Sequence, residues 1–235
     1  MTEATPFDNR RPGKRPIRSF VLRQGRLTPA QARALETLWP AYGIDCQDGL
    51  FDWNAAFGRD AELVVELGFG NGDALVYMAT AEPEKNFVGI EVHPPGVGAA
   101  LQKIEKAGLS NVRIISVDGI DVLEKMLADG SLSELRLYFA DPWPKKRHHK
   151  RRIVQVVFLD LLAKKLRPGG LLHMATDWQP YAEHMLEVCE AHPAFSNRSV
   201  NDGYIDCPDW RPETHFERRG LRLGHGVWDL LYQRQ

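Results

Sequence analysis

Cysteine is scarce in this chain: Cys46, Cys189 and Cys207 are the three in 235 residues. They are odd in number, lie far apart and show no CxxC spacing, so neither a disulfide framework nor a structural zinc site is expected. We interpret all three as buried or half-buried free thiols, and we predict no metal site.

Long apolar runs are also lacking. No stretch reaches about 18 consecutive apolar residues, the length that crosses a bilayer as a helix. The N-terminus has no apolar run of signal-peptide length either. The sequence therefore predicts a soluble cytoplasmic protein with no membrane contact.

An overall positive charge is the third absence, since the formal net charge is −1. A protein that coats nucleic acid non-specifically is basic throughout, so any nucleic-acid contact here must come from local patches. Residues 1–26 form one such patch: seven Arg or Lys residues stand against Glu3 and Asp8, a net of 7 − 2 = +5. We predict a flexible basic N-terminal arm, with a solvated tail of no function as the alternative. Residues 27–235 are predicted to form a single domain.

Strand and helix patterns alternate along most of the chain. Thr28-Pro29 is typical of a helix start, residues 41–58 look irregular, and a Gly-rich turn at 224–226 separates two possible arms of an antiparallel hairpin. Such βαβ alternation predicts a parallel sheet covered on both faces. Strands are expected at 63–67, 87–90, 112–117, 135–139, 171–175, 216–223 and 226–233, with helices at 73–80, 96–107, 120–128, 152–166 and 179–191. The pattern resembles the class I methyltransferase fold, a Rossmann-like, doubly wound α/β fold whose mostly parallel seven-stranded sheet ends in an antiparallel hairpin.

The first strand ends in a glycine-rich turn with the pattern E-x-G-x-G-x-G, formed by Glu66, Gly68, Gly70 and Gly72. Glycines permit a tight turn and a close approach of backbone to ligand. The dinucleotide fingerprint is G-x-G-x-x-G instead, and a carboxylate before the glycines would repel a pyrophosphate. The same carboxylate attracts an ammonium group, which favours the amino-acid moiety of S-adenosylmethionine.

Acidic residues also follow the second and third strands. Glu91 stands 91 − 72 = 19 residues after the last glycine, a position suited to accepting hydrogen bonds from ribose hydroxyls. Asp118 follows the third strand and is a candidate acceptor for an adenine amino group. Each acid alone is more often a turn residue or helix cap, but three at successive strand ends indicate a cofactor site.

The fourth strand is followed by Asp141-Pro142-Trp143-Pro144. Two prolines remove backbone donors and fix φ, so the strand must end there in a stiff loop that holds Asp141 beside the cofactor. Trp143 offers either a flat face on which a base stacks or a plug for the edge of the sheet.

A run of cations, Lys145 to Arg152, comes next. One interpretation is a solvated charged helix start. Cations at a helix N-terminus oppose the macrodipole, however, and the run adjoins the predicted site, so phosphate binding explains its placement better.

The segment from Asp141 to Ile153 is very similar to the signature of the bacterial tRNA (guanine-N7)-methyltransferase family. The glycine turn and its acids match as well, and so do Ala175-Thr176-Asp177 and Thr214 to Gly220, which is similar to the family's T-x-F-E-x-R-G. The resemblance covers roughly residues 60–235, and Arg18-Ser19-Phe20-Val21 in the arm also resembles the family.

The resemblance implies a tRNA (guanine(46)-N7)-methyltransferase that moves a methyl group from S-adenosyl-L-methionine to a variable-loop guanosine. It implies no obligatory protein partner and a monomer or homodimer. The roles it implies are catalysis for Asp141; cofactor binding for Glu66, Gly68, Gly70, Gly72, Glu91, Asp118 and Asp141; substrate binding for Lys145, Asp177, Thr214, His215, Phe216 and Glu217; and RNA binding for Arg147, His148, His149, Lys150, Arg151 and Arg152.

Three other functions compete. The same fold acting on a protein or small molecule leaves the basic run without a purpose. An RNA-binding module without catalysis does not need the strand-end acids. A nicotinamide dehydrogenase is disfavoured by Glu66 and by the glycine spacing.

Overall fold

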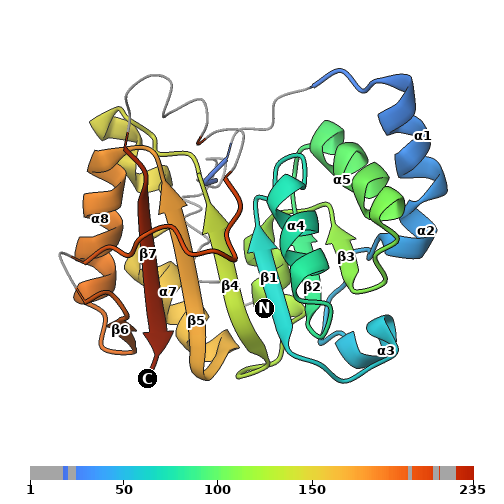
Figure 1. Ribbon diagram of the computed structural model, residues 1–235. Helices are drawn as coiled ribbons and strands as arrows, with labels where there is room; N and C mark the ends of the chain where they lie inside the picture. Colours follow the sequence, from blue (N-terminus) through green and yellow to red (C-terminus); the bar gives the residue numbers. More distant parts are fainter. Residues whose placement is uncertain (1–17, 21–24, 201–202, 214–216, 218–225) are drawn as a thin grey trace, which may run out of the picture.

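A twisted sheet with helices on both faces organises the chain (Figure 1). The computed structural model describes residues 18–20, 25–200, 203–213, 217 and 226–235. Within this part of the chain seven strands form one sheet in the order β3-β2-β1-β4-β5-β7-β6. The strands are β1 (Leu63–Leu67), β2 (Asn86–Ile90), β3 (Val112–Ile115), β4 (Leu132–Tyr138), β5 (Leu166–Thr176), β6 (Phe195–Asn197) and β7 (Trp228–Arg234).

Strands β1 to β5 run parallel, and β7 lies antiparallel between β5 and β6. The strand order reverses between β1 and β4, so the chain leaves these two neighbours in opposite directions. In open α/β sheets the crevice at such a switch point, beyond the carboxyl ends of the strands, is where ligands bind. The topology therefore predicts a ligand site at the carboxyl ends of β1 and β4.

Helices fill both faces of the sheet because β1 is apolar on both sides. Val64 packs with α1, α4 and α5, whereas Leu63, Val65 and Leu67 pack with α3, α6, α7 and α8. The helices are α1 (Pro29–Thr37), α2 (Trp39–Tyr42), α3 (Trp53–Phe57), α4 (Asp73–Ala81), α5 (Pro94–Ala107), α6 (Gly119–Lys125), α7 (Val156–Lys165) and α8 (Gln179–Glu190), with a 3₁₀ helix η1 (Lys146–Arg151).

α4 and α5 cover only one half of their face of the sheet. Over β4, β5 and β7 the described residues include no helix on this side, and residues 203–213, here called the cover segment, cross in front of β7 and β5 (Figure 1). The backbone of Ile205 pairs with that of Asp229 at the edge of β7. Two buried polar side chains of the strands contact the cover segment: His173 lies against the Trp210 ring, and Asp229 accepts from Arg211.

The predicted fold class and the antiparallel end of the sheet are confirmed. Thr28 caps α1, and its side chain accepts a hydrogen bond from the Gln31 amide, as predicted. The predicted hairpin needs a correction, since β7 pairs with β6, a strand that was not predicted. Of its proposed first arm, 216–223, only Glu217 belongs to the described residues.

Three local predictions also need correction. α7 begins at Val156, and the basic residues before it form η1 instead of the start of an α-helix at 152. The segment 41–58 contains the short helix α3, capped by Asp52. The strand expected at 171–175 is longer, since β5 begins at Leu166 and includes Gly169 with a φ of 78°.

The three cysteines are free, but Cys207 is exposed where a buried or half-buried thiol was predicted. Among the described residues, no helix is long and apolar enough to cross a membrane. The described residues also contain no group of three or more His, Cys, Asp or Glu side chains arranged to hold a metal ion. The basic arm falls mostly on residues 1–17 and 21–24, outside the part of the chain described.

Candidate active site

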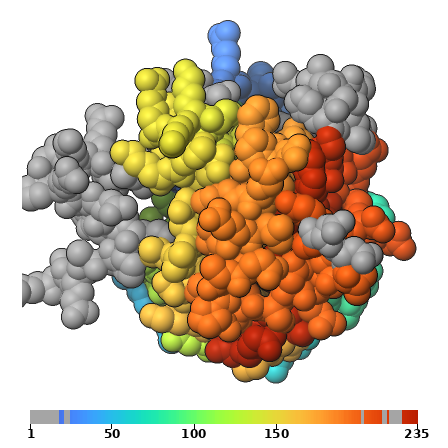
Figure 2. All heavy atoms as spheres, turned by 90° about the vertical axis from the view of Figure 1, so that its left-hand side faces the viewer, coloured from blue at the N-terminus to red at the C-terminus, as the bar shows by residue number. Residues whose placement is uncertain are grey.

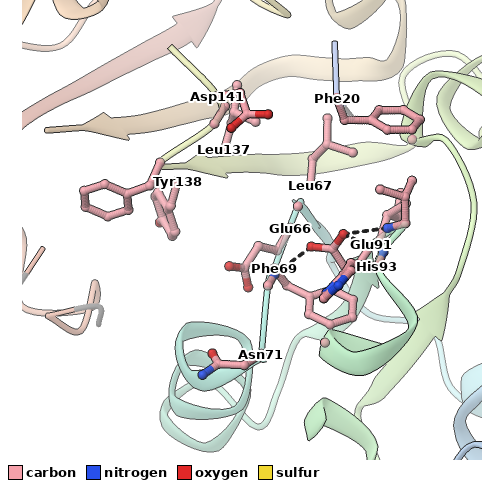
Figure 3. Close-up of a pocket in the computed structure, with 18 of the residues that line it drawn as sticks. Phe20, Glu66, Leu67, Phe69, Asn71, Glu91, His93, Leu137, Tyr138 and Asp141 are labelled. Carbon is pink, nitrogen blue, oxygen red and sulfur yellow. Dashed lines mark hydrogen bonds between the residues drawn. The ribbon is translucent and has the colours of Figure 1, made fainter. Parts of the chain in front are cut away.

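A cavity of about 660 Å³ lies at the carboxyl ends of β1 to β4. Because parallel strands end at one edge of the sheet, the acidic residues predicted from separate parts of the sequence meet there. Figure 3 shows Tyr138 and Asp141 on one side of the cavity and Glu91 on the other, with Glu66 at its floor. Gly68, Gly70, Asp118, Ser19 and Phe20 also line the cavity, whereas Gly72 is the N-cap residue of α4 and is not part of the lining.

The backbone of the glycine turn lies directly at the cavity. Gly68, Gly70 and Gly72 have φ values of 79°, 61° and 79°, which other residues rarely adopt. α5 passes so close that a Cβ on Gly96 would lie 2.2 Å from the Gly70 carbonyl oxygen. A side chain on Gly72 or Gly96 would collide with Ala100 or with the Gly70 carbonyl, whereas at Gly68 and Gly70 the positive φ alone disfavours one.

Glu66 is the most unusual carboxyl group in the cavity. Its side chain is buried, and its Oε2 atom has no hydrogen-bond partner among the described residues. Burial raises its pKa to about 8; Arg136 opposes this shift and the charge of Glu91 adds to it. An orphaned buried carboxyl next to a glycine turn fits an ammonium ligand, as the methionine moiety of S-adenosyl-L-methionine requires.

Glu91 is held by backbone amides on three sides. Its Oε2 accepts from Gly70 N at 2.9 Å, and its Oε1 accepts from Val92 N and His93 N at 2.6 and 2.9 Å (Figure 3). An ionised carboxylate offers about four acceptor sites, so capacity remains for a ligand hydroxyl. The orientation of this side chain is therefore set before any ligand arrives.

Asp118 is both a helix cap and part of the cavity lining. It caps α6 by accepting from Ile120 N at 3.2 Å, and it also lines the cavity. Burial raises the pKa of its carboxyl group. The helix-cap interpretation and the ligand interpretation are thus compatible for this residue.

The loop after β4 is strained. Phe139 and Trp143 have φ values of 53° and 47°, uncommon for residues with a side chain. Asp141 lies between them, exposed at the rim of the cavity. Such strain persists only where surrounding contacts over-determine the backbone, and here they hold Asp141 in position.

Trp143 contacts residues 18–20 and Arg151, and its predicted role as a stacking face for a base stays a prediction. Its Nε1 donates to the Ser19 carbonyl at 2.9 Å, and the Arg151 guanidinium lies 4.2 Å from its ring centroid. Arg151 in turn donates to the carbonyls of Arg18 and Phe20 at 3.0 and 3.3 Å. Together Trp143 and Arg151 hold residues 18–20 against the cavity, which Ser19 and Phe20 help to line.

The predicted basic run divides into exposed and buried members. Lys145, Arg147 and Lys150 are exposed on or beside η1, while His148, His149 and Arg151 are half-buried. Figure 2 shows the yellow segment that includes η1 projecting at the top of the molecule in that view. Arg152 is only 4% exposed and donates to the Pro142 carbonyl at 2.9 Å, so it supports the loop from inside.

Of the remaining predicted substrate residues, Asp177 is half-buried directly after β5. Thr214, His215 and Phe216 lie outside the described residues. Glu217 is 5% exposed, and both of its oxygens accept from Arg211.

Sequence reasoning missed the wall formed by Tyr138 and Phe139 and assigned no role to Ser19 and Phe20. The signal for the first pair was available, because Tyr138 and Phe139 stand at the end of a strand, separated from Asp141 by Ala140 alone.

Comparison with known proteins adds independent information. A family described as "Putative methyltransferase" matches residues 60–230. The tRNA (guanine-N(7)-)-methyltransferase of Alcanivorax borkumensis is 55% identical over 221 residues, 94% of this chain and 92% of that protein. The protein of the same name from Shewanella amazonensis is 53% identical over 236 residues, 100% of this chain and 99% of its own length.

Solved structures support the fold alone, because their sequences are distant. An rRNA methylase from Streptococcus thermophilus superposes with a TM-score of 0.51 at 12% identity, covering 74% of this chain and 87% of its own. A SAM-dependent methyltransferase from Aquifex aeolicus gives a TM-score of 0.50 at 14% identity, covering 77% and 87%. Both likenesses support the fold described above.

Proposed function

Because this chain belongs to the tRNA (guanine-N7)-methyltransferase family and is an S-adenosyl-L-methionine-dependent methyltransferase, we propose that it methylates N7 of guanosine 46 in the tRNA variable loop. One observation carries the proposal. A single cavity holds the orphaned Glu66 carboxyl at its floor and opens at Asp141, next to the exposed cations of η1.

Bound S-adenosyl-L-methionine supplies a methyl group on a positively charged sulfur. Glu66 binds its ammonium group, Glu91 accepts from the ribose hydroxyls, and Asp118 accepts from the adenine amino group. The backbone of Gly68, Gly70 and Gly72 leaves room for the amino-acid moiety. Each role matches a carboxyl or turn that lines the cavity.

The substrate atom explains why a strong base is unnecessary. Guanine N7 has an in-plane lone pair and no proton to remove, so the rate depends on holding N7 in line with the methyl carbon. Positive charge moves to the guanine ring during transfer, and the fixed carboxylate of Asp141 stabilises it. Asp177 accepts from the guanine N1–H and amino group, which rejects adenine because its edge carries a different donor pattern.

The RNA docks on the surface beside the cavity. Lys145, Arg147 and Lys150 are exposed there and reach phosphates, whereas Arg152 acts indirectly by holding the loop. The target base must be splayed out of its stack to enter. We propose that tRNA is the sole macromolecular partner the reaction requires, that the chain works as a monomer or homodimer, and that it acts in the cytoplasm.

The decisive experiment incubates the protein with labelled S-adenosyl-L-methionine and unmodified tRNA, then digests the RNA and identifies the methylated nucleoside and its position. We expect 7-methylguanosine at position 46, lost in Asp141→Ala and kept in Asp48→Ala, an exposed carboxylate outside the cavity. Label in another nucleoside or position refutes the proposed target. Full activity of Asp141→Ala refutes its role.

A further inference from the structure

A buried ion-pair network fastens the cover segment to the sheet. Arg211, in the cover segment, is 2% exposed; its Nε and Nη2 donate to the two carboxylate oxygens of Asp229 on β7 at 2.6 and 2.8 Å. Its Nη1 and Nη2 donate to the two oxygens of Glu217 at 2.6 and 2.9 Å. One guanidinium therefore makes two forked contacts with two buried carboxylates, a geometry that fixes both of them.

The network continues to the wall of the cavity. Asp229 also contacts His173 Nε2 at 2.9 Å, and His173 Nδ1 contacts the Tyr138 hydroxyl at 2.8 Å. Because Asp229 is an acceptor paired with Arg211, the hydrogen-bond pattern assigns the His173 proton to Nε2, so Tyr138 donates to Nδ1. Tyr138 itself lines the cavity.

Simple packing does not account for this arrangement. Removing three charges from water is expensive, and apolar side chains of similar size often stabilise a protein equally well or better. The guanidinium carbon lies 6.0 and 5.8 Å from the ring centroids of Tyr138 and Phe139, which places the charge directly behind the cavity wall. A buried ion triad at this location indicates that the side chains it joins must be held in an exact position relative to the cavity wall.

We propose that Arg211 is a positioning residue for methyl transfer: it holds the Glu217 carboxylate in a fixed place beside the guanidinium that lies behind Tyr138 and Phe139 in the cavity wall. The inference rests on the function proposed above, with Glu217 as a substrate-binding residue, the role that the family resemblance implies for it. Arg211 does not touch the reacting atoms; it acts through Glu217. Asp229 anchors the guanidinium from β7, and the Tyr138–His173 pair anchors Asp229.

The test compares Arg211→Lys and Arg211→Gln with the wild type. Lysine keeps the charge and most of the volume but lacks the two forks, so Arg211→Lys reports on geometry, and unchanged affinity for S-adenosylhomocysteine shows that the variant is folded. Arg59→Lys is the matched control, because Arg59 is a half-buried arginine that bonds Asn86 and the Lys85 carbonyl at the start of β2, away from the cavity. The measurements are kcat and KM for tRNA, and the affinity for S-adenosylhomocysteine by calorimetry.

We expect both Arg211 variants to lose on the order of 10²-fold in kcat/KM for tRNA, the size of effect that a misplacement of about 1 Å produces. Affinity for S-adenosylhomocysteine stays close to the wild-type value, and Arg59→Lys behaves as the wild type in both measurements. Because Arg211 acts through Glu217, adding Arg211→Lys to a Glu217→Gln background costs little more than Glu217→Gln alone.

Unchanged tRNA kinetics in Arg211→Lys would overturn the inference. A loss of S-adenosylhomocysteine affinity as large as the loss in kcat/KM would also overturn it. So would a double variant, Arg211→Lys with Glu217→Gln, whose loss in kcat/KM equals the product of the two single losses. A wild-type protein that methylates no tRNA overturns the proposed function instead. The two failures are therefore distinguishable.

Discussion

At the scale of single residues, Glu66 links protonation to cofactor binding. Burial raises the pKa of its carboxyl group to about 8, so the ligand-free group is largely protonated at neutral pH. An ammonium ligand requires the ionised form. The proton on Glu66 must therefore leave before the cofactor is held at full strength.

Affinity for S-adenosyl-L-methionine should consequently rise as pH increases from about 5 to about 8, since the raised pKa in the folded protein is about 8. Glu66→Gln should abolish this slope and lower affinity roughly 10- to 100-fold, the value of a hydrogen bond between charged groups. Calorimetry at several pH values measures both effects. Glu105→Gln, an exposed residue on α5, should leave the slope intact, and a persistent slope in Glu66→Gln would exclude Glu66 as its source.

The raised pKa of Glu66 also makes the free energy of unfolding depend on pH. Between the ordinary pKa of 4.5 and about 8, the folded ligand-free chain keeps a proton that the unfolded chain releases. The free energy of unfolding should therefore fall as pH rises through this interval, and Glu66→Gln should flatten the curve. Urea unfolding without ligand measures the difference; curves of equal slope would contradict the prediction.

Individual residues differ in how far sequence reveals them. The three strand-end acids were predictable because parallel strands end at one edge, whatever the details of packing. Arg152 and Arg211 were not, because a surface cation and a buried one look alike in sequence. Their burial depends on groups such as Pro142 and Asp229 that other elements bring to them.

At the scale of elements, η1 presents cations beside the cavity without the dipole penalty expected of an α-helix start. Its residues Arg147 and Lys150 are exposed, and α7 begins only at Val156. A short 3₁₀ turn therefore accommodates a cationic cluster that a regular helix N-terminus would disfavour. This explains why a helix beginning at 152 was the wrong prediction.

Neutralising these cations should weaken tRNA binding in a salt-dependent way. In Arg147→Gln with Lys150→Gln, we expect the slope of log affinity against log salt to drop by about 1 for each phosphate contact removed. Titrations of tRNA at several salt concentrations measure it. The charge-matched control, Lys106→Gln with Lys164→Gln on exposed sites elsewhere, should keep the slope; equal slopes in all variants would place the RNA on another surface.

The contact between Trp143 and residues 18–20 gives a second prediction at this scale. Trp143→Phe removes the donor to the Ser19 carbonyl and should weaken S-adenosylhomocysteine binding about fivefold, the value of a hydrogen bond of about 1 kcal/mol. Trp53→Phe is the control, since the Trp53 Nε1 is buried with no partner among the described residues. If both variants bind equally well, residues 18–20 contribute nothing to the cofactor site.

At the scale of the whole molecule, the cavity joins residues from the arm and from four strands, so its ligand should stabilise the entire fold. At a concentration 100 times its dissociation constant, S-adenosylhomocysteine should add about 2.7 kcal/mol to the free energy of unfolding. For a chain of this size that raises Tm by roughly 5–10 °C. A thermal melt with and without ligand measures the shift, and its absence would show that the ligand does not bind the native state.

Sequence periodicity was sufficient for the parallel core because β1 to β5 alternate regularly with helices. It failed at β6, whose three residues are too few to show a pattern, and at α3, whose five residues fall within a segment that looked irregular. Both elements owe their existence to neighbours: β6 to the free edge of β7, and α3 to the apolar face on which Trp53 packs.

Among the described residues, the face of the sheet that carries α4 and α5 is divided between two separate parts of the chain. The glycine turn, Glu91 and Asp118 belong to the half covered by α4 and α5, whereas the cover segment rests on β4, β5 and β7. The residues proposed to bind the methyl donor and the cover segment are therefore encoded in separate stretches of the gene. We propose that changes in the codons for the cover segment alter how the acceptor is positioned while the methyl donor stays the same.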